Sequence, residues 1–98
     1  MSGIVSYEMM VILKENFTEI QLKTWALNFA KQLQGSNVSE ISVISRGKRD
    51  LAYPIGNQKR GNFIQINFLS IPNCINKFSD QLNFDNNVLR FLILNKKF

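Results

Sequence analysis

The chain has 98 residues, of which twelve are Lys or Arg and seven are Asp or Glu, so its net charge is +5. This length suffices for one domain with a modest core, and the positive charge favours a polyanionic partner. The absence of histidine and the single cysteine, Cys74, remove the commonest general base, the commonest metal ligand and any internal disulfide. We therefore expect no enzyme, no metal and no cofactor.

Residues 1–98 are expected to form a single domain, because no repeat, linker or break in composition divides them. The apolar run at residues 9–13 is too short to cross a membrane, which takes about twenty residues. The N-terminus lacks the basic start and cleavage site of a signal peptide.

Residues 5–13 predict a strand, since they are rich in apolar and β-branched side chains that would alternate between two faces. The segment Thr18 to Gln21 has the form of a capping box, which marks a helix start. A helical stripe follows, and Gly35 supplies the expected stop. Its members are Leu22, Trp25, Ala26, Phe29 and Leu33. We expect Trp25 to be a core anchor rather than a stacking residue for a ligand.

Two more strands flank a basic segment. Residues 38–45 alternate with serine and predict a half-exposed strand, with Ile41 and Val43 pointing inward. Residues 62–69 alternate between an Ile and Phe face and a face of Phe63, Gln65 and Asn67. The segment between the two strands is too short for a crossover helix, so we expect an antiparallel hairpin whose arms extend into the basic segment.

A second, short helix is predicted from Pro72, whose fixed φ and missing amide suit the first helical position. Residues 85–87 form a turn, and residues 88–94 form a last strand that is apolar except for Arg90. With right-handed crossovers, the order β-α-β-β-α-β predicts a ferredoxin-like α+β fold. Its four-stranded antiparallel sheet has the first and third strands in the centre and both helices on one face.

The other face of the sheet is then uncovered. The alternation predicts that it carries Glu8, Met10, Ile12, Phe63, Gln65 and Asn67, together with either Arg90 or Phe91. A mixed apolar and polar open face suits another macromolecule, and we predict Met10, Ile12, Phe63 and Arg90 as its partner-binding residues. Two alternatives stay open for Arg90: an ion pair with an acid such as Glu8, or projection toward a partner.

Five cations gather around the hairpin with Asp50 as the acid among them: Arg46, Lys48, Arg49, Lys59 and Arg60. Arg can bind phosphate through its fork and Lys as a point charge, so the segment favours a polyanion over a merely solvated, edge-protecting tip. Tyr53 either stacks on an unpaired base or packs beneath the loop, and packing is the favoured alternative. Pro54 forces an extended or turn conformation on Tyr53.

Other features carry weaker signals. Lys96 and Lys97 are typical of a solvated tail, and Cys74 of a structural thiol. The third strand begins with a basic, glycine-containing stretch but lacks the continuing aromatics of RNA-recognition domains that share this topology. A small-molecule regulatory domain of the same topology is a further alternative.

Four features together resemble the bacterial-type small-subunit ribosomal protein S-six family. They are Tyr7-Glu8 in the first strand, Gly47 before basic residues, the string Leu51-Ala52-Tyr53-Pro54-Ile55, and Asp85-x-x-Val88-x-Arg90 entering the last strand. The similarity runs in order along nearly the whole chain, and the Leu-Ala-Tyr-Pro-Ile string is its specific part. Asp50 departs from the family pattern, because many members carry a cation or glutamine there.

The resemblance implies a non-catalytic protein that pairs with ribosomal protein S-eighteen on the central domain of small-subunit ribosomal RNA. It implies that Arg49, Tyr53, Lys59 and Arg60 face RNA or the partner, and that Leu51 and Pro54 shape the loop. With the charge pattern, the predicted RNA-binding set is Arg46, Lys48, Arg49, Tyr53, Lys59 and Arg60. The expected location is the small ribosomal subunit, in plastid (chloroplast) stroma or bacterial cytoplasm, with no membrane or small-molecule substrate. The alternative is a non-ribosomal ferredoxin-like interaction module that binds a protein or small ligand on its open sheet face.

Overall fold

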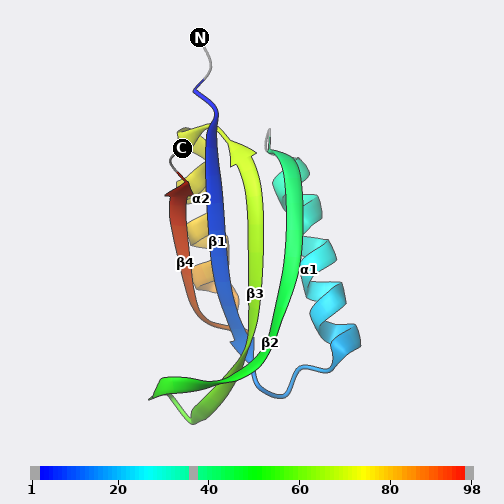
Figure 1. Cartoon of the computed structure of the whole chain (residues 1–98), viewed down its shortest axis with the longest axis vertical. Coiled ribbons are helices and arrows are strands. Elements are labelled where there is room, and N and C mark those ends of the chain that lie inside the picture. The colour runs from blue at the N-terminus through cyan, green and yellow to red at the C-terminus, as the bar shows by residue number, and fades with distance from the viewer. Residues whose placement is uncertain (1–2, 36–37, 97–98) are drawn as a thin grey trace.

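The computed structural model describes residues 3–35 and 38–96. Four strands form one antiparallel sheet in the order β2-β3-β1-β4: β1 (Val5–Lys14), β2 (Ser39–Ile55), β3 (Gln58–Ser70) and β4 (Val88–Lys96). Two helices, α1 (Glu19–Gln34) and α2 (Ile75–Phe84), lie behind this sheet in Figure 1 and leave its front face open. The predicted ferredoxin-like fold, with the first and third strands in the centre, is confirmed.

The core lies between the sheet and the helices. Side chains of alternate residues in β1 and β3 point into it and meet the apolar stripes of both helices. The fully buried members include Met9, Val11, Leu13, Ile66, Phe68, Leu33, Phe78 and Leu82. Phe68 links the layers, since its ring stacks on Tyr7 and meets the edge of Phe78, with ring centres 5.6 and 6.1 Å apart. Each fully buried apolar side chain stabilises the fold by about 1.5–3 kcal/mol.

Helix α1 begins with the predicted capping box. The Thr18 hydroxyl accepts from the Gln21 backbone amide at 3.2 Å, and the Gln21 side chain accepts from the Thr18 amide at 2.9 Å. Gly35 caps the other end with a helical φ of −70°, so the helix ends there without a left-handed residue.

Trp25 packs against the buried core, as predicted, although it lies at the margin of the core and is only partly buried. The side chain is half-buried, and its ring stacks on Phe29 with centres 5.3 Å apart. Its Nε1–H donates to Asp85 Oδ2 at 2.7 Å, while Asp85 Oδ1 accepts from the Asn87 amide at 2.9 Å. Trp25 therefore ties α1 to the turn that leads into β4.

The β2–β3 hairpin is longer than the predicted strands at residues 38–45 and 62–69. Both arms continue through the basic segment to a tight turn at Gly56 and Asn57, where Gly56 has a φ of 59°. The register shifts between Ser45 and Gly47 and again between Asp50 and Ile55, and such irregularities bend and twist a strand. In Figure 1 the end of the hairpin swings across the base of the sheet. The basic residues thus lie on a bent ladder, not in a loop.

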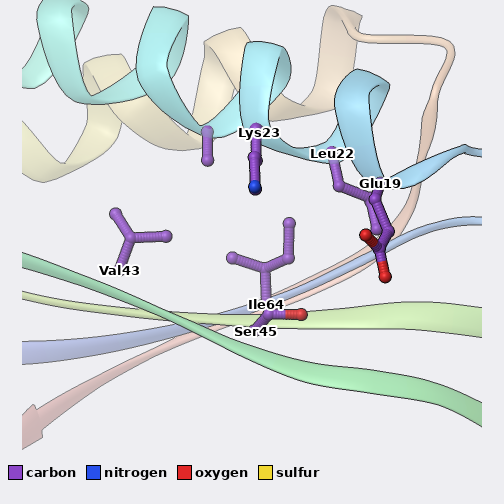
Figure 2. Close-up of a pocket in the computed structure, with 7 residues that line it drawn as sticks. Glu19, Leu22, Lys23, Val43, Ser45 and Ile64 are labelled. Atoms are coloured by element: carbon purple, nitrogen blue, oxygen red, sulfur yellow. The ribbon is translucent and has the colours of Figure 1, made fainter.

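Helix α1 covers β2 incompletely. Ile41 packs against the core as predicted, but Val43 is 41% exposed although it lies on the helix side of the sheet. A hollow of about 370 Å³ separates the two elements there. Figure 2 shows Val43 and Ile64 rising from the sheet toward Leu22 and Lys23 of α1. The prediction that Val43 points inward is right for its direction and wrong for its burial.

Candidate functional site

Three cross-strand rows of side chains cover the open sheet face. In the order β4, β1, β3, β2 they are Leu94–Glu8–Asn67–Ser42, then Leu92–Met10–Gln65–Ile44, then Arg90–Ile12–Phe63–Gly47. The predicted membership of this face is confirmed. Phe91 pairs with Val11 on the helix side, so Arg90 is the residue that belongs to the open face.

Exposed apolar side chains gather on this face along β4, between the charged residues Glu8 and Arg90. Leu92 and Leu94 are 56% and 48% exposed, and they flank the half-buried side chain of Met10. Sequence reasoning placed Met10, Ile12 and Phe63 here but did not single out Leu92 and Leu94. Their spacing of two and four residues from Arg90 could have identified them, because residues an even number of positions apart on a strand point to the same face.

Arg46 crosses the middle of the open face. Its Nε donates to Gln65 Oε1 at 2.9 Å and its Nη2 donates to the same oxygen, while Gln65 Nε2 donates to Asn67 Oδ1 at 3.2 Å. Arg46 is thus held over the sheet by this polar network, away from the end of the hairpin.

Arg49 joins the basic hairpin to the apolar face. Its guanidinium carbon lies 5.9 Å from the centre of the Phe63 ring, within the range of a cation–π interaction. Its Nε also donates to the backbone oxygen of Arg46 at 3.2 Å. Gly47 lies opposite Phe63 with a φ of 86°, a left-handed conformation that glycine adopts readily.

The remaining cations lie on the exposed arms of the hairpin. Lys48, Lys59 and Arg60 are exposed, and Arg60 Nε lies 3.0 Å from Asp50 Oδ1. An exposed ion pair of this kind contributes only about 0–1 kcal/mol to stability. Asp50 therefore partly neutralises the charge of Arg60 and adds little to the stability of the fold.

Tyr53 projects into solvent with 82% of its side chain exposed. The favoured prediction, that it packs beneath the loop, is wrong, because the strand carries it outward at the bent end of the hairpin. Neighbouring Leu51 is half-buried and Pro54 is exposed. No peptide bond within residues 3–35 and 38–96 is cis.

The described part of the chain holds no group of three or more His, Cys, Asp or Glu side chains that could bind a metal ion. Neither of the helices described here is long and apolar enough to span a membrane. Cys74 is half-buried at the start of α2. Of the predicted solvated tail, Lys97 and the side chain of Lys96 lie outside the described residues.

Known proteins share both the sequence and the fold. The family model described as "Ribosomal protein S6" matches residues 6–95. "Small ribosomal subunit protein bS6c" of Trieres chinensis is 64% identical over 96 residues, which cover 98% of this chain and 100% of that protein. "Small ribosomal subunit protein bS6" of Picosynechococcus sp. is 35% identical over 89 residues, which cover 91% of this chain and 77% of that protein.

Among solved structures, 30S ribosomal protein S6 from Thermotoga maritima matches with a TM-score of 0.81 at 18% identity, over 95% of this chain and 88% of that one. This match shows the same fold. The sequence relatives have plastid-type and bacterial names, and they are structural proteins of ribosomes, not enzymes. The chain therefore belongs to the ribosomal protein S6 family, the S-six family that its motifs resemble.

Proposed function

We propose that this chain is a structural constituent of the small subunit of a plastid or bacterial-type ribosome. In this role it binds the central domain of small-subunit ribosomal RNA together with ribosomal protein S-eighteen. One observation carries the proposal: the end of the cationic hairpin reaches the Ile12 and Arg90 end of the open sheet face, next to an exposed apolar strip formed by Met10, Leu92 and Leu94.

The hairpin suits RNA. Lys48, Arg49 and Lys59 are exposed on its arms, and Tyr53 presents an uncovered ring on the same element. Cations bind phosphates, and an aromatic ring offers a stacking surface for an unpaired base. If the complex engages three to five phosphates, the slope of log affinity against log salt is expected to be about −2 to −5.

The apolar strip suits a protein. Leu92, Leu94 and Met10 form a contiguous surface that carries no phosphate-binding group, and exposed apolar patches mark protein interfaces. A partner that covers this strip would stabilise the complex by removing apolar surface from water.

The two surfaces share one rigid sheet, so a protein bound to one would be held in a set orientation to RNA bound to the other. The function requires no bond making or breaking. It consists of holding one protein and one RNA segment in a fixed relation, and pre-ordering of this kind lowers the entropy lost on assembly.

The test compares Leu92→Asp with Leu27→Asp. Both leucines are exposed, but Leu27 lies on α1 in the helix layer behind the sheet. A buried unpaired carboxylate is costly, so Leu92→Asp should abolish association with purified S-eighteen in calorimetry while Leu27→Asp leaves it unchanged. Co-sedimentation of the unmodified chain with small subunits at moderate salt supplies the second readout. If the chain stays free of subunits and S-eighteen does not bind it, the alternative of a non-ribosomal interaction module replaces this proposal.

A further inference from the structure

A hollow lies between the bent hairpin end and the open sheet face, where the apolar strip meets the basic arms. Its volume is about 350 Å³, at the lower end of the roughly 300–1,000 Å³ of ligand pockets. Most of its lining is apolar. The side chains that shape it are those of Ile12, Leu51, Tyr53, Ile55, Phe63 and Arg90.

The hollow is lined by one acidic and one basic residue, and the acidic residue is already in an ion pair. Two charged residues, Asp50 and Arg90, line it, and Asp50 is already bound to Arg60 at 3.0 Å. Arg90 is exposed and lies in register with Ile12, between the apolar floor and solvent. An occupant that combines an apolar group with a negative charge would complement both features.

The lining favours a protein side chain over a nucleobase. The Arg49 guanidinium carbon lies 5.9 Å from the centre of the Phe63 ring, so one face of this aromatic residue is already in contact with a cation. The other floor residues, Ile12, Leu51 and Ile55, are aliphatic and cannot read the edge of a base by hydrogen bonds. The hollow also adjoins the apolar strip, because Arg90 lines the hollow and Leu92 is the next residue of β4 on the same face.

We infer that this hollow is the anchor site for the protein partner, and that it takes one apolar or aromatic side chain flanked by a carboxylate that pairs with Arg90. The inference rests on the proposed function, because it specifies where and by what chemistry the protein partner is held. A side chain buried in such a pocket is where binding energy concentrates in an interface. The Arg49 contact with Phe63 would then put the anchor directly beside the RNA-binding arm.

The first test fills the hollow. Ala52 is exposed and lines it, so Ala52→Trp places an indole in the space without altering the core. Leu27→Trp adds an indole on the helix layer and serves as the matched control. Affinity for purified S-eighteen, measured by calorimetry without RNA, should fall at least about tenfold for Ala52→Trp and stay unchanged for the control. Circular dichroism confirms that both variants are folded.

The second test addresses the charge. Arg90→Glu should weaken S-eighteen binding by about tenfold or more, and Arg90→Lys should retain most of it, because Lys keeps the charge. A photo-crosslinking residue at position 52 of the chain within assembled small subunits should form its adduct with S-eighteen. An adduct with RNA, or full affinity of folded Ala52→Trp, overturns the anchor site. Either result leaves the proposed function intact, because Leu92→Asp tests that function separately. If the unmodified chain does not bind S-eighteen at all, both the proposed function and the anchor site are refuted.

Discussion

The guanidinium carbon of Arg49 lies 5.9 Å from the centre of the Phe63 ring, and this contact joins the basic hairpin to the apolar sheet face. Phe63 occupies a central strand, while Arg49 lies on the bent part of β2. The ring thus orients a cation that the proposed function assigns to RNA, and it does so from the surface assigned to the protein partner.

Phe63→Leu tests this orientation. Leucine keeps the apolar floor but removes the ring face, so RNA affinity in the presence of S-eighteen should fall by about two- to fivefold, the equivalent of about 0.5–1 kcal/mol. Filter binding at constant salt measures the change. In an Arg49→Ala background the same Phe63→Leu substitution should cause no further loss of RNA affinity. If it lowers the affinity as much there as in the unmodified chain, the ring acts independently of Arg49.

Asp50→Asn is expected to strengthen RNA binding. The substitution removes the carboxylate that lies 3.0 Å from Arg60, so the guanidinium becomes fully available to phosphate. Affinity should rise by a few-fold, with stability changed by less than about 1 kcal/mol because the pair is exposed. Asp80→Asn on α2 changes the net charge equally and is the control for long-range electrostatics. An equal gain from both variants would assign the effect to net charge alone.

Pro54→Gly tests whether the shape of the hairpin end matters beyond its charge. Proline fixes its own φ and restricts Tyr53, and Pro54 lies where the β2–β3 register is irregular. Glycine should weaken RNA binding by roughly tenfold, about 1.4 kcal/mol, because the more flexible hairpin end loses more conformational entropy on binding. The salt slope should stay nearly constant, since no charge changes. Affinities are compared at a temperature where both proteins are fully folded, and equal values would limit the proline to a role in folding.

Gly61→Ala should destabilise the sheet. An added Cβ would lie 2.5 Å from Ile12 Cγ2 and 3.2 Å from the Leu13 backbone oxygen, both closer than ordinary contacts. Chemical denaturation should show a loss of about 1–3 kcal/mol in the free energy of unfolding, as for other overpacked sites. Gly35→Ala is the control, because its Cβ would meet backbone atoms no closer than 3.6 Å. If Ile12→Ala does not reduce the cost of Gly61→Ala, the clash with Ile12 is not its cause.

The sequence by itself determined the fold and the membership of the open face in the first and third strands. Alternation with a period of two assigned Met10, Ile12 and Phe63 to one side of the sheet, and the capping box placed the start of α1 correctly. The Leu51-Ala52-Tyr53-Pro54-Ile55 string indicated the family that the comparisons show. These signals are local, so they do not depend on which elements later become neighbours.

Only the tertiary structure decided what these residues do with one another. The face of Arg90 depends on the pairing of β4 with β1, which places Arg90 opposite Ile12, and alternation within β4 alone cannot reveal it. Trp25 contacts Asp85 across 60 residues, and Arg46 contacts Gln65 across 19, because packing brings distant segments together. Tyr53 is exposed because the irregular ladder bends the hairpin end away from the layers that could have covered it. Burial and pairing depend on the elements opposite a residue, and that information lies in the packing of the whole chain rather than in any one segment.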